Sequence, residues 1–145
     1  MKSLCVSLQS DPAIWAHVRI MLKGILEMEM VPARDANLIT LGVDEAFTNI
    51  MRHAYQDSRT GIVDLEVSCR DQRLCITLRD YGKQVPDEQI RSRPLDEIRP
   101  GGLGVWIIKT VFDSVERDHL PHGGTILRLE KDLTKPVLPE SRSSR

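Results

Sequence analysis

The chain has 145 residues, and its 20 Lys and Arg against 21 Asp and Glu give a formal net charge of -1. This length fits one ordinary domain, and a hydrophobic content of 41% with 28% charged residues is typical of a globular protein. The near-zero net charge excludes the strong basic excess of sequence-independent nucleic-acid binders and of polybasic membrane anchors. No apolar run approaches the ~18 residues of a membrane span. We therefore expect no direct nucleic-acid partner and no membrane partner.

The cysteines Cys5, Cys69 and Cys75 are odd in number and form no C-x-x-C pair. This pattern predicts neither a disulfide framework nor a cysteine zinc site. Each cysteine lies among alternating apolar residues, which predicts small buried hydrophobes. The N-terminus has too few apolar residues for a signal peptide, so we expect a cytoplasmic protein.

Periodicity predicts a strand followed by two helices in the first half of the chain. Apolar residues alternate from Leu4 to Leu8, which predicts a strand. Ser10-Asp11-Pro12 is a helix-start signal, and helical apolar spacing follows over 13–28. A second apolar stripe predicts a helix over about 33–55.

The second half alternates short strands with one long loop and one helix. Mixed charges and prolines between 81 and 100 break every periodic pattern, which predicts a functional lid. The expected strands are 63–69, 74–78, 114–116 and 125–130, and the expected helix is 103–112.

This order of elements predicts an α+β protein. We expect a two-layer α/β sandwich in which one mixed, mostly antiparallel sheet carries helices on one face. The domain should span 1–132, with a lid at about 81–102. The tail over 133–145 is rich in Pro, Ser and Arg and is expected to be disordered.

Glu45 and Asn49 are four residues apart on the second expected helix, so they share one face. The apolar stripe through Val43, Phe47 and Ile50 lies on another side. A carboxylate here can accept a proton from an attacking hydroxyl, and an amide oxygen one turn later suits Mg²⁺. Alone, this spacing is more often an ordinary polar helix face.

Three further motifs carry candidate binding groups. Asp80 ends a strand and can accept hydrogen bonds from an exocyclic amine, and Gly82 lets a flat ring approach the backbone. Glycines at 101, 102 and 104 precede a helix, where backbone N–H groups and the helix dipole favour phosphate. Thr125 opens the final strand, close to Asp80 if the two strands are neighbours. Singly, these motifs are common as a turn, a hinge and a hairpin.

Together, the order and spacing of these motifs resemble the GHKL superfamily of ATPases and kinases, which share the Bergerat ATP-binding fold. The resemblance runs from Leu4 to about Lys131. Within the superfamily, the stretch from Val43 to Tyr55 is very similar to the first motif of the anti-sigma factor serine/threonine kinases of bacterial partner-switching systems.

The resemblance implies ATP and Mg²⁺ as ligands and assigns a role to each motif residue. At the reacting end, Glu45 would be the general base toward a partner's serine hydroxyl and Asn49 the Mg²⁺ ligand. Gly102 and Gly104 would contact the phosphates. The lid arginines are candidates for the γ-phosphate, without an individual assignment.

At the adenine end, the resemblance implies that Asp80 binds the amino group, that Gly82 lies beside the ring and that Thr125 supports the site. The sequence departs from the related pattern at Gln84, where a second glycine is frequent. His53, one turn after Asn49, is more often a packing or hydrogen-bonding residue near such a pocket than a metal ligand.

The function that this resemblance implies is an ATP-dependent serine/threonine protein kinase and anti-sigma factor. It would phosphorylate a STAS-domain anti-anti-sigma antagonist and bind a sigma factor or other regulatory target. A homodimer is expected, with the N-terminal strand as a pairing edge. Two alternatives remain open: a nucleotide-gated binding module without kinase turnover, and the catalytic ATP-binding domain of a histidine kinase.

Overall fold

The computed structural model describes residues 2–90 and 103–138. Its helices are α1 (Pro12–Met28), α2 (Ala33–Asn49) and α3 (Gly104–Val111), together with a π-helical turn (Ile50–Ala54) and a short 3-10 turn (Asp87–Ile90). Its strands are β1 (Lys2–Gln9), β2 (Ile62–Arg70), β3 (Arg73–Asp80), β4 (Ser114–His119) and β5 (Thr125–Asp132).

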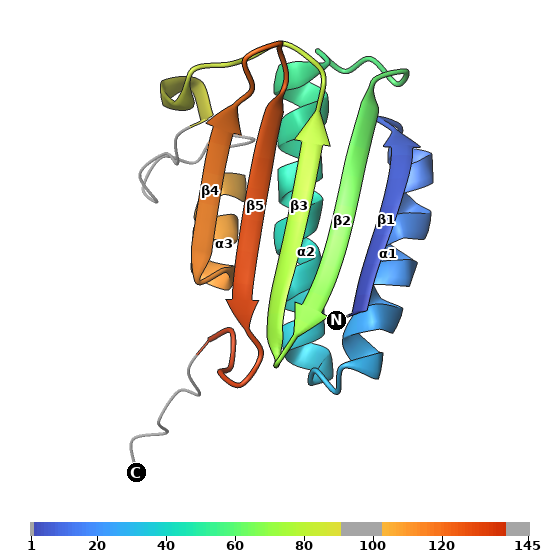
Figure 1. Ribbon diagram of the computed structural model, residues 1–145, viewed down its shortest axis with the longest axis vertical. Helices are drawn as coiled ribbons and strands as arrows, with labels where there is room; N and C mark the ends of the chain where they lie inside the picture. Colours follow the sequence, from blue (N-terminus) through green and yellow to red (C-terminus); the bar gives the residue numbers. More distant parts are fainter. Residues whose placement is uncertain (1, 91–102, 139–145) are drawn as a thin grey trace.

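The strands form one sheet in the order β1-β2-β3-β5-β4, and the helices all cover the same face of it (Figure 1). This confirms the expected α+β sandwich. The sheet differs from the expected mixed one, because within the described residues each neighbouring pair is antiparallel. The physical reason is the position of β5. Strands β3 and β4 point the same way, but β5 lies between them and is antiparallel to both.

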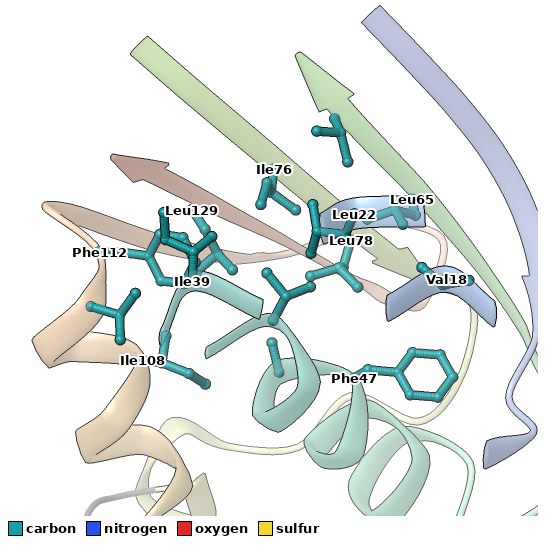
Figure 2. Close-up of a cluster of buried hydrophobic side chains, with 14 of the residues drawn as sticks. Val18, Leu22, Ile39, Phe47, Leu65, Ile76, Leu78, Ile108, Phe112 and Leu129 are labelled. Atoms are coloured by element: carbon teal, nitrogen blue, oxygen red, sulfur yellow. The ribbon is translucent and has the colours of Figure 1, made fainter. Parts of the chain in front are cut away.

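The core lies between the sheet and the helices (Figure 2). Alternate residues of β3, including Leu74, Ile76 and Leu78, are fully buried there, as the period-two pattern predicted. Trp15 of α1 stacks on Phe47 of α2 with ring centroids 4.1 Å apart. This aromatic pair joins the two long helices.

Asp44 of α2 accepts two hydrogen bonds from side chains of α1 beside this pair. The Trp15 Nε1–H donates to Asp44 Oδ1 at 2.6 Å, and the Arg19 Nε–H donates to the same oxygen at 2.8 Å.

Asp11, rather than Ser10, caps α1, because its carboxylate accepts the Ala13 N–H at 2.9 Å. The other tryptophan, Trp106 on α3, is 44% exposed.

The second expected helix changes type before it ends. The α-helical bonding of α2 stops at Asn49 and gives way to the π-helical turn, in which the Tyr55 N–H reaches Ile50 O five residues back. The Tyr55 hydroxyl in turn donates to the Ile62 carbonyl and accepts the Tyr81 N–H at 2.8 Å. The wider turn is held at the ends of β2 and β3, and such turns are frequent at functional sites.

The packed part of the chain extends beyond β5. Leu133, Val137 and Leu138 pack against the core, and the buried Lys131 Nζ donates to Asp132 O at 2.8 Å and Lys135 O at 3.1 Å. The segment 133–138 therefore differs from the disordered tail expected from its composition, because it supplies apolar contacts and, at Lys135, a carbonyl acceptor for a buried ammonium. Residues 139–145 lie outside the described residues.

Cys5, Cys69 and Cys75 form no disulfide within the described residues. Cys69 is buried and Cys75 is half-buried, but Cys5 is exposed. The expectation of three buried cysteines is wrong for Cys5, because it lies on the helix-free face of the edge strand β1.

The end of β3 meets the start of β5 so closely that a side chain has no room. Gly124 has a φ of +79°, and a Cβ there would lie 2.1 Å from Asp80 O. The neighbouring Gly123 has a φ of +101°, but a Cβ there would have no atom within 4 Å.

We predict that Gly124→Ala destabilises the fold more than Gly123→Ala. The Gly123 variant bears backbone strain alone, about 1 kcal/mol, whereas the Gly124 variant also forces the two strands apart and should lose at least about 2–3 kcal/mol. Urea unfolding of both variants and the parent chain measures the difference. Equal losses would contradict the close approach.

Candidate functional site

A cavity of about 370 Å³ lies at the junction of α2, the π-helical turn, α3 and the strands β3, β4 and β5. Its apolar wall comes from all these helices and from two strands, and consists of Ala46, Ile50, Ala54, Val85, Val105, Ile108, Val115 and Leu127. Its polar and charged lining consists of Asn49, His53, Asp80, Lys83, Asp87, Lys109, Arg117 and Thr125. This is the composition of a small-molecule site, mostly apolar with a few convergent polar groups.

Asp80 and Thr125 meet at one end of this cavity. Asp80 is 3% exposed, and its Oδ1 accepts the Gly82 N–H at 3.0 Å. Burial raises the pKa of the Asp80 carboxyl, opposed by the backbone N–H groups of Gly82 and Thr125. The buried Thr125 hydroxyl has no hydrogen-bond partner among the described residues.

A buried hydroxyl without a partner costs free energy until a ligand satisfies it. Asp80, an acceptor, and Thr125, whose hydroxyl lacks a partner, line the same cavity. This donor and acceptor set fits a flat heterocycle that bears an amino group next to a ring nitrogen, such as adenine.

Gly82 serves close packing in this structure. A Cβ at Gly82 would lie 2.4 Å from Ala54 O, so the absent side chain lets the chain after β3 lie against the π-helical turn. Gly82 is not among the residues that line the cavity. The expectation that Gly82 lies beside a bound adenine ring stays a prediction.

Glu45 and Gly104 come together across the contact of α2 with α3. A Cβ at Gly104 would lie 2.5 Å from Glu45 Oε2, so a larger residue here would displace the end of the Glu45 side chain from its position beside the helix start. Burial raises the pKa of Glu45, the neighbouring Asp44 carboxylate adds to the rise, and Arg52 opposes it. Asn49, one turn further along α2, lines the cavity.

The described residues contain no cluster of three or more His, Cys, Asp or Glu side chains suited to hold a metal ion. Asn49 brings one amide oxygen to the cavity wall, and Asp80 and Asp87 bring carboxylates. Such an arrangement fits Mg²⁺, which usually keeps several waters and binds through one or two protein oxygens together with a substrate's phosphates. Gly102 and the arginines of the expected lid lie outside the described residues.

His53 lines the cavity, as a residue near the expected pocket. Burial lowers its pKa, and the Arg52 and Arg117 cations lower it further, so the imidazole is neutral at neutral pH. The sequence reasoning missed Arg117, Lys109 and the wall role of Lys83. Arg117 and Val115 are two residues apart on β4 and therefore share its inner face. In so short a strand, this spacing is a weak sequence signal of a cavity residue.

One comparison places the chain in a family. The model of the histidine kinase-like ATPase domain matches residues 8–131. The chain therefore belongs to the family of histidine kinase-like ATPase domains, as the resemblance predicted, and it is an ATP-binding, kinase-like domain.

Among known proteins, the chain is 34% identical to an anti-sigma F factor of Bacillus subtilis over 97 residues, which cover 64% of this chain and 66% of that protein, just under two thirds of its length. It is 29% identical to the serine-protein kinase RsbW of Halalkalibacterium halodurans over 126 residues, covering 81% of this chain and 75% of that protein. A solved structure of the RsbU and RsbW domains of a Mycobacterium tuberculosis protein has the same fold, with a TM-score of 0.64 and 17% identity over 90% of this chain and 32% of that one.

Among the described residues, no helix is both long enough and apolar enough to span a membrane.

We predict that Thr125→Val stabilises the protein without ligand. The substitution replaces a buried, unpartnered hydroxyl with a methyl group of the same shape, which should gain about 1 kcal/mol in free energy of unfolding. The control is Thr40→Val, because the buried Thr40 hydroxyl donates to Ala36 O at 2.7 Å and its loss should cost about 0.5–1.5 kcal/mol. Opposite signs in thermal or urea unfolding are expected, and a loss at Thr125 would show that its hydroxyl has a partner.

Proposed function

We propose that the chain is an ATP-dependent serine/threonine protein kinase and anti-sigma factor. It phosphorylates a STAS-domain anti-anti-sigma antagonist and binds a sigma factor or other regulatory target in the cytoplasm. The observation that carries the proposal is that buried Asp80 and Thr125, with its unpartnered hydroxyl, line the same cavity as Asn49, one helical turn from Glu45.

At the adenine end, Asp80 accepts a hydrogen bond from the base's amino group, and the Thr125 hydroxyl bonds a ring nitrogen or a water beside it. The apolar wall around them excludes water from both faces of the ring. Because Asp80 is buried, its hydrogen bond to the base is made in a low dielectric and discriminates against a base without an amino group.

At the phosphate end, Asn49 supplies an oxygen to Mg²⁺, and the backbone at Gly102 and Gly104 supplies N–H groups at the start of α3. When bound, ATP supplies the phosphoryl group and Mg²⁺ neutralises its charge. The Lys83 and Lys109 side chains add positive charge to the same cavity. They complement a polyanion although the whole chain is nearly neutral.

Glu45 is the proposed catalytic base. Its carboxylate is half-buried beside the start of α3, where it can accept the proton of a partner's serine or threonine hydroxyl. The raised pKa makes it a stronger base than an ordinary surface glutamate. The remaining work of phosphoryl transfer is positioning and charge stabilisation.

The names of the relatives, anti-sigma F factor and serine-protein kinase RsbW, support a sigma-factor partner and a protein substrate. We also propose a homodimer that pairs through β1, since β1 lies at one edge of the sheet within the described part of the chain. An edge strand presents unpaired backbone groups to a second copy.

We predict that the chain transfers the γ-phosphoryl group of ATP to a serine or threonine of a STAS-domain protein that it captures. Glu45→Gln should slow transfer by about 100-fold or more, because it removes a general base, while ATP affinity changes little. Single-turnover phosphorylation with labelled ATP and mass spectrometry of the product measure this. Glu27→Gln, an exposed glutamate on α1, is the matched control and should transfer at the parent rate.

Other outcomes separate the alternatives. Phosphohistidine in the product would assign the chain to histidine kinases. Tight ATP binding with no transfer to a bound partner would make it a nucleotide-gated binding module. Undiminished transfer by Glu45→Gln would remove Glu45 from the mechanism.

We predict that phosphoryl transfer falls on acidification at a higher pH than an ordinary glutamate would give. Glu45 acts as a base only when deprotonated, and its raised pKa moves the acidic limb of the pH–rate profile upward. Asp44→Asn removes a neighbouring negative charge, which lowers the Glu45 pKa and should shift the limb to lower pH. Asp44 is not among the charges that shift the pKa of His53. An acidic limb that does not move in Asp44→Asn would therefore belong to a group other than Glu45.

A further inference from the structure

The chain immediately after β3 is held as one wall of the cavity by side chains that the catalytic proposal does not use. This wall segment is defined here as residues 83–87, of which Lys83, Val85 and Asp87 line the cavity. Its first contact is with the π-helical turn, since the Lys83 N–H donates to Ala54 O at 2.9 Å.

Gln84 ties the wall segment to the hairpin between β4 and β5. Its Nε2 donates to Leu120 O at 2.7 Å and to Gly124 O at 2.9 Å. The two carbonyls belong to the residues whose own bond closes that hairpin, with the Leu120 N–H donating to Gly124 O at 3.0 Å. One side-chain amide thus uses both of its N–H groups to join two loops far apart in sequence.

Strand β4 holds the same segment from its inner face. The buried Val85 presents its carbonyl oxygen to two donors, the Arg117 Nη1–H at 3.2 Å and the His119 Nε2–H at 3.1 Å. Arg117 also forms an ion pair with Asp87 at 2.5 Å. The wall segment is therefore fixed by the π-helical turn, the hairpin and β4 together.

We propose that Gln84 is a positioning residue for the nucleotide site: it fixes the wall segment before ligand arrives and so sets nucleotide affinity. The inference rests on the proposed function, because the ligand of the cavity is taken to be an adenine nucleotide. Gln84 contacts no ligand itself. It acts through Val85, whose side chain forms part of the wall.

The physical basis is the cost of ordering a loop. A segment that is already fixed in the free protein loses little freedom when a ligand binds against it, whereas a loose segment must be ordered at the expense of affinity. In the parent chain the wall segment is ordered when the protein folds. Without the two Gln84 hydrogen bonds, the free energy of ordering this segment would be spent when the ligand binds. Since the wall contacts the ground state and the transition state alike, the effect belongs in KM and not in kcat.

The test compares Gln84→Met with the parent chain. Methionine keeps the length of the side chain and removes both donors. Two readouts are taken: hydrogen–deuterium exchange of the amides of residues 83–89 without ligand, and ATP affinity by calorimetry together with KM and kcat for phosphoryl transfer. We expect faster exchange, an ATP affinity about five- to tenfold weaker, a matching rise in KM and an unchanged kcat.

Two further variants act as controls. Gln89→Met alters the same residue type in the following turn, where Gln89 is exposed, and should match the parent in every readout. Gln84→Lys retains an N–H donor group that reaches both carbonyls and should restore slow exchange and most of the affinity. Thermal unfolding of all variants checks that each is folded.

The outcomes separate this inference from the proposed function. Unchanged exchange in Gln84→Met would overturn the fixed wall, and faster exchange with unchanged affinity would overturn its role in binding. A fall in kcat without a rise in KM would overturn the ground-state argument. A folded parent chain that binds no adenine nucleotide would overturn the proposed function and the affinity claim together, while the exchange data would still decide whether Gln84 holds the segment.

Discussion

The site depends on one buried carboxylate at the end of a strand. Asp80 is withdrawn from water, so its charged form is disfavoured unless backbone N–H groups and a ligand compensate. The N–H groups of Gly82 and Thr125 offset part of this cost, and the pKa of Asp80 remains raised. Because Thr125 begins β5, the carboxylate can be supported this way only if β5 lies directly beside β3, so the strand order of the sheet is a condition for the site.

That strand order is in turn made possible by glycine. Gly124 lies so near Asp80 O that no other residue fits without displacement of the strands. Gly82 lies equally close to the backbone carbonyl of Ala54, and Gly104 lies against the end of the Glu45 side chain. At these three contacts the absent side chain lets backbone meet backbone or carboxylate, and the polar groups of the cavity converge as a result.

Much of the fold was predictable because its elements carry clear periodic patterns. The β2–β3 hairpin and the two long helices follow from alternating and helical apolar spacing, and the family assignment follows from the ordered motifs. The change from α2 to a π-helical turn was not predictable, because it depends on Tyr55 bonding to β2 and β3 across the structure. The packing of Val137 was missed for a related reason, since composition alone carries no information on a tertiary contact.

The candidate site was predictable where a motif marks it and not elsewhere. Glu45, Asn49, Asp80 and Thr125 stand in recognisable strings. Arg117 stands in a short, mostly polar strand whose inward face is apparent only from the register with β5. Gln84 was visible in the sequence as a departure from a pattern, but its bonds to Leu120 and Gly124 join residues about 40 positions apart.

The two tryptophans of the chain occupy opposite environments. Trp15 is buried between α1 and α2, where it stacks on Phe47. Trp106 on α3 is partly exposed to water and follows Val105, which lines the cavity. Indole emission shifts to the red with exposure to water, so the two fluorophores differ in colour and in the region they sense. The protein thus carries an internal optical reference in its helical layer and a partly water-exposed optical reporter on α3.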